Sequence, residues 1–307
     1  MKIAYLILAH HQPGHLKRLI EALKYKNDAF FVHIDLKSDM SEFKDIKGED
    51  IFFMPERVKV YHAGFSQVEA MIFLMQAASK KEDFDYYIFL SGADYPIKAP
   101  AKIHDFLKKN YGQNFLSFYN YSADLVENSH LSGYYNVDFS DSVLKIVSLI
   151  SRVIFKLSRK VLPKRSLADG MIPYRGSTHW CLYKDVMNYL LKFLDSDKGG
   201  KLVRFFRNSF GPDEMIFHTI ILNSSFAKSC RGYETDMEND KRILLGENKA
   251  YLHYIDWNPD REDPAVFDEG DFEKLKESDL FFARKFDEKK SYKLLDKIDR
   301  YLLGDDK

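Results

Sequence analysis

Short apolar runs alternate with amphipathic stretches along the first part of the chain. Runs rich in β-branched and aromatic residues predict strands at residues 3–9, 29–34, 51–54, 86–91 and 114–119. Stretches with helical spacing of apolar positions follow some of these runs, at residues 14–25, 66–80 and 100–109. Strands that alternate with helices build a mostly parallel sheet flanked by helices. The pattern therefore predicts a Rossmann-like α/β unit over residues 1–120.

The alternation is interrupted at residues 121–175 and then resumes. The later pattern predicts strands at 178–183 and 250–256, and helices at 185–194, 212–222, 271–277 and 287–303. No repeat, low-complexity stretch or clean linker separates the two parts. We therefore expect one domain over residues 1–307, with a first half at 1–120, an insertion at 121–175 and a second half at 176–307.

The insertion contains a basic segment at residues 143–165. Its cations have no acid among them, and several lie three or four residues apart with an apolar face opposite. These cations are Lys145, Arg152, Lys156, Arg159, Lys160, Lys164 and Arg165. Such a helix either lies on an anionic membrane surface or packs on the core and turns a basic stripe to solvent. The pattern leaves both interpretations open.

Charge and cysteine content narrow the class of protein. Basic and acidic residues both number 46, so the net charge gives no reason to expect a nucleic-acid partner. Cys181 and Cys230 are too few for a disulfide framework and fit a reducing compartment. The N-terminal apolar run lacks a cleavage site, and no stretch reaches the roughly 18 apolar residues of a membrane span. We expect a cytoplasmic protein, peripheral at the inner face of the membrane if residues 143–165 bind lipid.

Polar residues follow several of the predicted strands. His10, Asp35 and Asp94 come just after the first, second and fourth strands. Ligands of an open α/β sheet bind beyond the carboxyl ends of its strands. Asp35 would there accept hydrogen bonds from a nucleotide's ribose or base, or it caps a turn. The glycine patterns of dinucleotide-binding and P-loop proteins are missing from this sequence.

Carboxylates are few where a metal ion would be held. The loop at residues 91–96 (SGADYP) is similar to acidic loops that bind a divalent cation, but Asp94 is its only carboxylate. Hard cations need several oxygen ligands. The aspartates of Asp195-Ser196-Asp197 close a predicted helix before a glycine pair. We therefore expect no metal ion.

Two adjacent cations and two adjacent acids are further candidates. Arg284 and Lys285 interrupt an apolar predicted strand, where they are costly unless an anion meets them. They either bind an anionic ligand or lie on an edge strand in solvent. Asp213 and Glu214 open a predicted apolar helix, where they either complement the helix dipole or carry chemistry.

Several segments in this order resemble the core-2/I-branching N-acetylglucosaminyltransferase and peptide O-xylosyltransferase family, glycosyltransferase family fourteen. The likeness extends from Tyr5 to Asp287. Its clearest stretches are residues 32–35 (VHID), 88–98 (IFLSGADYPIK), 176–177 (GS), 212–214 (PDE) with 217–219 (FHT) and 223–224 (NS), 254–257 (YIDW) and 281–286 (FFARKF). The resemblance implies a GT-A fold and an inverting transfer from a UDP-sugar without a metal ion.

The resemblance also implies roles for particular residues. Asp35 would contact the uridine, and His10 would line the same pocket. Arg284 and Lys285 would hold the diphosphate, with Arg242 as a further candidate for that task. Glu214 matches the glutamate that acts as general base in the branching enzymes. These roles belong to the family and are expectations for this chain.

The chain departs from the family at some motif positions. His62-Ala63-Gly64 stands where relatives have Trp-Gly-Gly, and Thr178 follows Gly-Ser where xylosyltransferases place an aspartate base. A threonine hydroxyl does not act as a base near neutral pH, so that role falls to Glu214. We count His62, Thr178, Trp180 and Asp94 among the expected substrate contacts. Golgi relatives carry a membrane anchor and disulfides, so their absence from this sequence implies a bacterial cytoplasmic member.

The sequence thus predicts an inverting, metal-independent glycosyltransferase that moves N-acetylglucosamine or xylose from a UDP-sugar to a glycan. Residues 1–120 would bind the nucleotide, and residues 176–307 would bind the acceptor and pyrophosphate. A lipid-linked glycan of bacterial surface polysaccharide synthesis is the acceptor we expect. One alternative is a GT-A transferase whose metal ion is held by Asp94 and a distant carboxylate. Another is a non-catalytic protein that binds nucleotide-sugars or carbohydrate on the same scaffold.

Overall fold

The computed structural model describes residues 1–121, 131, 133–135, 165, 167, 170–233, 251–258, 260–261 and 264–304. The basic segment at 143–165 lies outside these residues apart from Arg165, and Arg242 lies outside them as well. The division of the chain into two halves and an insertion stays a prediction.

The first half contains strands, α-helices and one short 3₁₀ turn, η1. In chain order these are β1 (Ile3–Ala9), α1 (Pro13–Leu23), β2 (Ala29–Ile34), η1 (Met40–Phe43), β3 (Ile51–Phe53), α2 (Phe65–Lys81), β4 (Tyr86–Ser91), β5 (Asp94–Pro96), α3 (Pro100–Lys109), β6 (Phe115–Leu116) and β7 (Tyr119–Asn120).

The second half adds further strands, helices and 3₁₀ turns. They are β8 (Tyr174–Arg175), β9 (Trp180–Tyr183), α7 (Lys184–Leu194), α8 (Asp197–Phe206), η3 (Pro212–Glu214), α9 (Ile216–Leu222), η4 (Ser225–Ser229), β10 (His253–Ile255), η6 (Glu269–Asp271), α10 (Phe272–Glu277), β11 (Phe282–Arg284) and α11 (Tyr292–Tyr301).

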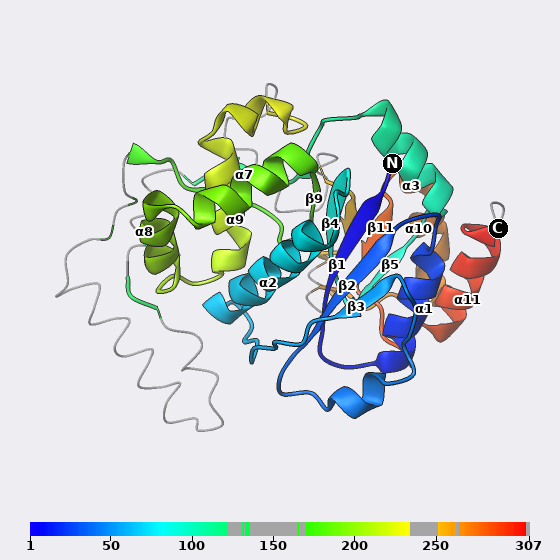
Figure 1. The fold of residues 1–307 in the computed structure, drawn as a ribbon. Helices are drawn as coiled ribbons and strands as arrows, with labels where there is room; N and C mark the ends of the chain where they lie inside the picture. The colour runs from blue at the N-terminus through cyan, green and yellow to red at the C-terminus, as the bar shows by residue number, and fades with distance from the viewer. Residues whose placement is uncertain are drawn as a thin grey trace.

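A six-stranded, mostly parallel sheet forms the centre of the molecule, with the strand order β3-β2-β1-β4-β9-β6 (Figure 1). Strand β1 pairs in parallel with β2 on one side and with β4 on the other. Strand β9 is antiparallel to both β4 and β6. The expected fold class, a mixed and mostly parallel GT-A sheet flanked by helices, is confirmed.

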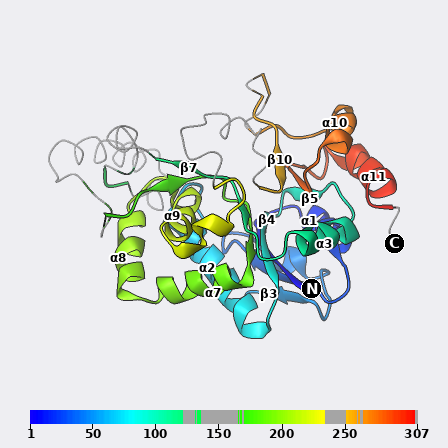
Figure 2. The same ribbon diagram turned by 90° about the horizontal axis from the view of Figure 1, so that it is seen from above.

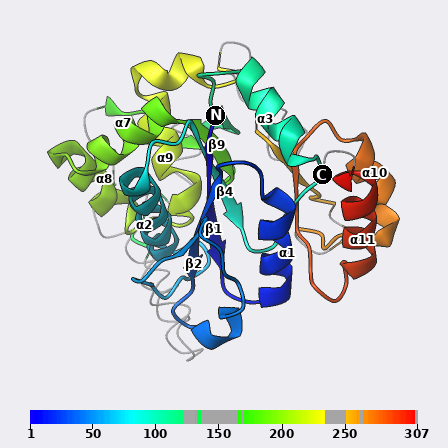
Figure 3. The same cartoon turned by 45° about the vertical axis from the view of Figure 1, so that its right-hand side comes forward.

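Helices cover both faces of this sheet because successive residues of its strands point to opposite sides. In β1, Tyr5 and Ile7 pack into the core that α1, α3, α10 and α11 cover. Leu6 packs instead into the core beneath α2, α7, α8 and α9. Figure 3 shows these two groups of helices on either side of the central strands. The sheet is therefore buried on both faces.

A second sheet has the order β10-β11-β5 and lies beside α10 and α11 (Figure 2). Strand β5 follows β4 almost at once in the chain, yet it pairs antiparallel with β11. In this register Asp94 is opposite Arg284, and Pro96 is opposite Phe282. The small sheet thus joins the end of a central strand to the C-terminal part of the chain.

Two local predictions need correction. Asp195-Ser196-Asp197 was expected to close a helix before a turn at the glycine pair. Instead, Ser196 caps a new helix, α8, by accepting the N–H of Gly199. The helix expected at 212–222 is broken at Met215, whose φ of -129° is not helical. Asp213 and Glu214 therefore lie in the 3₁₀ turn η3, before α9 begins.

None of the helices in the described ranges is both long and apolar enough to cross a membrane.

Candidate active site

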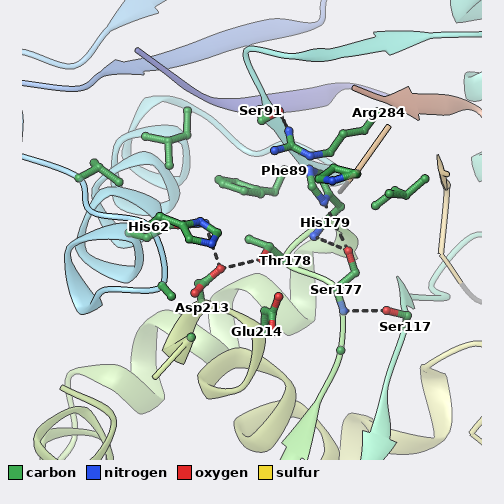
Figure 4. A pocket seen from close by; sticks show the side chains of 18 of the residues that line it. His62, Phe89, Ser91, Ser117, Ser177, Thr178, His179, Asp213, Glu214 and Arg284 are labelled. Atoms are coloured by element: carbon green, nitrogen blue, oxygen red, sulfur yellow. Dashed lines mark hydrogen bonds between the residues drawn. The ribbon is translucent and has the colours of Figure 1, made fainter. Parts of the chain in front are cut away.

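A cavity of about 740 Å³ lies at the carboxyl ends of the central parallel strands. Its wall includes His10 after β1, Asp35 after β2 and Ser91 at the end of β4. Strand β1 lies between β2 and β4, so the chain order reverses at this point. Open α/β sheets bind their ligands where this reversal occurs. The second half closes the cavity with the loop between β8 and β9 and with the turn η3 (Figure 4).

Asp35 and His10 form one end of the cavity. Asp35 is 4% exposed, its Oδ1 accepts the backbone N–H of Lys37 at 2.8 Å, and its Oδ2 is 3.5 Å from the Lys37 ammonium. The His10 ring stacks on that of His11 with 4.0 Å between centroids. Partial burial and the neighbouring His11 lower the pKa of His10. This end thus offers a fixed carboxylate and a neutral ring, and the exposed His62 lies on the same lining.

Asp213 lies in the wall of the cavity, and one of its carboxylate oxygens accepts two hydrogen bonds. Its Oδ2 accepts a hydrogen bond from the Thr178 hydroxyl at 2.7 Å and another from the Gln67 amide at 2.9 Å. Its Oδ1 is buried and has no hydrogen-bond partner. Burial and the charge of Glu214 raise the pKa of Asp213 to about 7. Asp213 can therefore take up or lose a proton near neutral pH.

Glu214 is next to Asp213 but has a different environment. The guanidinium of Arg175 donates to Glu214 Oε2 from Nε at 2.9 Å and from Nη2 at 2.5 Å. The Glu214 side chain remains 35% exposed and lines the cavity. The backbone carbonyl of Glu214 also accepts the N–H of Gly176, which ties η3 to the loop before β9. Glu214 is thus held in place by two contacts and still faces the cavity.

Arg284 lines the cavity on the side opposite Asp213 and Glu214 (Figure 4), and Asp94 lies behind it. Asp94 is completely buried, and its Oδ1 is 3.1 Å from Arg284 Nη1. The same nitrogen donates to the Ser91 hydroxyl, which itself donates to Asp94 Oδ1 at 2.7 Å. In the part of the chain that the structure describes, both contacts of Arg284 use Nη1 and leave its Nη2 and Nε donors unused. The arginine therefore presents donors to the cavity from a fixed position.

Two histidines lie against the other oxygen of Asp94. His179 Nε2 is 3.1 Å from Asp94 Oδ2, and His253 Nε2 is 3.5 Å from the same atom. Burial alone would raise the pKa of Asp94, but His179, His253 and Arg284 hold it well below its usual range. Burial lowers the pKa of His253 to about 4, so that ring is neutral at physiological pH.

The cavity gathers seven of the candidate residues of the sequence analysis and leaves others out. It brings together His10, Asp35, His62, Thr178, Asp213, Glu214 and Arg284. The prediction that Trp180 contacts substrate is wrong, because its ring is 2% exposed and packs on Phe89 and Phe217. Asp94 lies behind the lining and acts on it through Arg284.

The two neighbouring cations are separated in the structure. Arg284 lines the cavity, whereas Lys285 does not. The backbone of Lys285 bonds with Ala265 and Phe267. Of these two cations, only Arg284 is therefore placed where it could meet a ligand in the cavity.

Sequence reasoning missed four residues of this site, which are Gln67, Arg175, His179 and His253. Arg175 and His179 flank the Gly-Ser-Thr motif, so proximity in the chain was an available signal. His253 directly precedes the motif at residues 254–257, so the same signal was available for it, but its contact with Asp94 joins distant parts of the chain. Asp195-Ser196-Asp197 contributes no residue to the cavity.

Comparison with known proteins finds a family match over most of the chain. The model of the Core-2/I-Branching enzyme family matches residues 3–280. Xylosyltransferase 2 of Bos taurus is 24% identical, and xylosyltransferase 2 of Homo sapiens is 25% identical. In each case the match covers 99% of this chain and 34% of the relative. The chain thus spans about a third of the length of these curated relatives.

Among solved structures, glucosyl-3-phosphoglycerate synthase from Mycobacterium tuberculosis is similar over 69% of this chain and 67% of its own. The sequence identity is 12% and the TM-score is 0.31, so this likeness carries no argument about the site.

Proposed function

The chain belongs to the Core-2/I-Branching enzyme family, and on that premise we propose that it transfers a sugar from a UDP-sugar to a hydroxyl group of a glycan. The observation that carries this proposal is the arrangement of the cavity. Asp35 lies at one end of the cavity, at the switch point of the sheet, and the fixed Arg284 lies in another part of its wall. The carboxylates of Asp213 and Glu214 line the same cavity. A nucleotide, a diphosphate and an attacking hydroxyl need these three kinds of group.

The donor would lie along the carboxyl ends of the central strands. Asp35 would accept hydrogen bonds from the uridine or ribose, and His10 would lie beside them. Arg284 would meet the diphosphate with its unused N–H donors. Because its guanidinium is fixed by Asp94 and Ser91 before the reaction, it needs no reorganisation as charge grows on the departing UDP.

Glu214 is the base in this proposal. The acceptor oxygen attacks C1 of the sugar from the face opposite UDP, its proton passes to Glu214, and the electron pair of the broken C1–O bond leaves with UDP. The anomeric centre is thereby inverted. Arg175 orients the Glu214 carboxylate through two hydrogen bonds to Oε2, and a proton acceptor must be held in place in this way. Transfer of N-acetylglucosamine or xylose is the form of the reaction that we propose.

We propose a glycan of bacterial surface polysaccharide synthesis as the acceptor, with the protein in the cytoplasm against the inner face of the membrane. The basic segment at 143–165 would touch the lipid. Arg165 does not take part, because its guanidinium donates to the backbone carbonyls of Gly133 and Asn208.

Replacing the other six cations of residues 143–165 by glutamine should abolish cosedimentation with anionic vesicles. Unchanged cosedimentation would remove the segment from membrane binding.

The central test is release of UDP from a panel of UDP-sugars in the presence and absence of glycan acceptors. Glu214→Gln should leave UDP affinity intact and lower transfer by roughly two to four orders of magnitude. Glu21→Gln, an exposed glutamate on α1, is the matched control and should transfer at the normal rate. Transfer by Glu214→Gln at the control rate would remove this residue from the mechanism. Binding of UDP without any transfer would favour a binding protein instead.

A further inference from the structure

Three metal-ligating side chains converge behind the cavity from separate parts of the fold. Asp94 is the first residue of β5, His179 directly precedes β9, and His253 is the first residue of β10. One ligand atom from each lies within 4.8 Å of those from the other two. All three residues are buried, with exposures of 0%, 7% and 1%. Segments that are distant in the chain thus deliver two imidazoles and one carboxylate to a single point.

Hydrogen bonding alone does not satisfy this cluster. The Nε2 atoms of His179 and His253 are both buried and have no hydrogen-bond partner among the residues that the structure describes. The nearest acceptor, Asp94 Oδ2, already accepts the backbone N–H of Ser91 at 2.7 Å. A carboxylate oxygen accepts about two hydrogen bonds, so at least one of the two rings would remain without a partner. A buried polar group without a partner destabilises the fold.

The spacing of the ligand atoms fits a small tetrahedral ion. Zinc binds histidine nitrogen and carboxylate oxygen at about 2.0–2.1 Å, so two ligands on a tetrahedral zinc are about 3.3 Å apart. The observed separations from Asp94 Oδ2 are 3.1 Å to His179 and 3.5 Å to His253. One ion at the centre of this cluster would take up the lone pairs of both rings at once.

The surroundings of the cluster suit such an ion. The second oxygen of Asp94 accepts hydrogen bonds from Ser91 and Arg284, and such outer contacts orient a ligating carboxylate. The imidazole and carboxylate ligands are of the types that zinc selects.

We propose that Asp94, His179 and His253 bind one divalent ion of the zinc type behind the wall of the cavity. Three protein ligands leave a fourth position for an oxygen ligand such as water. The ion joins β5, β9 and β10 and fixes the carboxylate that orients Arg284. This proposal does not rest on the proposed sugar transfer. It replaces the expectation, drawn from the single carboxylate of residues 91–96, that no metal ion is bound.

The first test is the metal content of tag-free protein, measured by inductively coupled plasma mass spectrometry. Wild type should carry about one zinc ion per chain. His179→Gln and His253→Gln should each lower this content at least tenfold. His33→Gln is the matched control, because His33 is equally buried on β2, where its ring accepts the N–H of Val58. Zinc retained by both cluster variants would assign the ion elsewhere and overturn the proposal.

A second measurement does not depend on whether the variants fold. Wild-type protein treated with a chelator should melt several degrees lower than before, and added Zn²⁺ should restore the melting temperature. Co²⁺ added to the same chelated protein should give the strong visible absorption of a four- or five-coordinate ion. A protein purified without metal that shows neither response to Zn²⁺ nor this absorption with Co²⁺ would overturn the proposal. The weak spectrum of a six-coordinate cobalt ion would also contradict it.

Discussion

At the scale of single residues, Asp213 and Glu214 show how two neighbouring carboxylates acquire different properties. Asp213 is enclosed, and burial together with the charge of its neighbour raises its pKa to about 7. Glu214 is partly exposed and carries an arginine on one oxygen. Sites that divide acid and base tasks between carboxylates are built by such differences in environment.

The raised pKa of Asp213 has a consequence for stability. In the unfolded chain its pKa is near 4, so the folded state holds the proton to higher pH. The stabilising contribution of this group is therefore complete below about pH 4 and is lost as the pH rises through about 7. The Asp213→Asn variant has no proton to lose as the pH rises. Its melting temperature minus that of wild type should therefore be larger at pH 8 than at pH 5. Asp195→Asn, at the exposed end of α7, should show no such difference.

Arg284 and Lys285 provide a second prediction at this scale. Arg284→Gln should raise the dissociation constant of UDP by roughly tenfold to a hundredfold, because it removes hydrogen bonds to a charged group. Lys285→Gln should leave that constant unchanged, since Lys285 does not line the cavity. Isothermal titration calorimetry distinguishes the two variants. Equal losses of affinity would mean that both cations meet the diphosphate.

At the scale of elements, long periodic segments were predictable and short ones were not. The bounds of β1, β2, β4 and α3 agree with the apolar pattern residue for residue. Strands β5, β7 and β8 have only two or three residues, too few to show a period of two. Helix α8 was missed because its first turn contains Gly199 and Gly200, which suggest a turn when no tertiary contact is known.

The loop between β8 and β9 depends on the absence of one side chain. A Cβ atom at Gly176 would lie 1.8 Å from the carbonyl oxygen of Ser117 and 2.8 Å from His218 Nε2. Gly176→Ala should therefore displace this loop and the Glu214 backbone bonded to it, and destabilise the protein by several kcal/mol. Gly200→Ala, inside α8, meets nothing closer than 3.6 Å and should stabilise it by up to about 1 kcal/mol. Denaturant unfolding measures the change in the free energy of unfolding of each variant, including its sign. Equal changes in the two variants would contradict the argument.

At the scale of the whole molecule, the sequence predicted the parallel sheet and the edge at which the cavity lies. It did not predict which distant residues meet there. Asp94 and Arg284 were each expected in the site, but nothing in the pattern showed that β5 and β11 place them opposite one another. Asp94 lies against His253 of β10 and against His179, which directly precedes β9. Only the assembled fold brings these residues together.

Ligand binding should stabilise this assembly as a unit. At about a hundred times its dissociation constant, UDP should add about 2.7 kcal/mol, which corresponds to an increase in melting temperature on the order of 5 °C. Differential scanning fluorimetry measures this shift. ADP at the same concentration serves as the control for recognition of the base. An equal shift with ADP would mean that Asp35 and His10 do not discriminate uracil.

The pairing of β5 with β11 also bears on how the protein is made. Residues 94–96 leave the ribosome long before the strand that completes their sheet, 282–284. The end of the cavity with Asp35 can thus take shape on a nascent chain, whereas the end with Arg284 must wait until about 190 further residues have been made. A product shortened by premature termination before residue 282 would keep every strand of the central sheet and still lack Arg284.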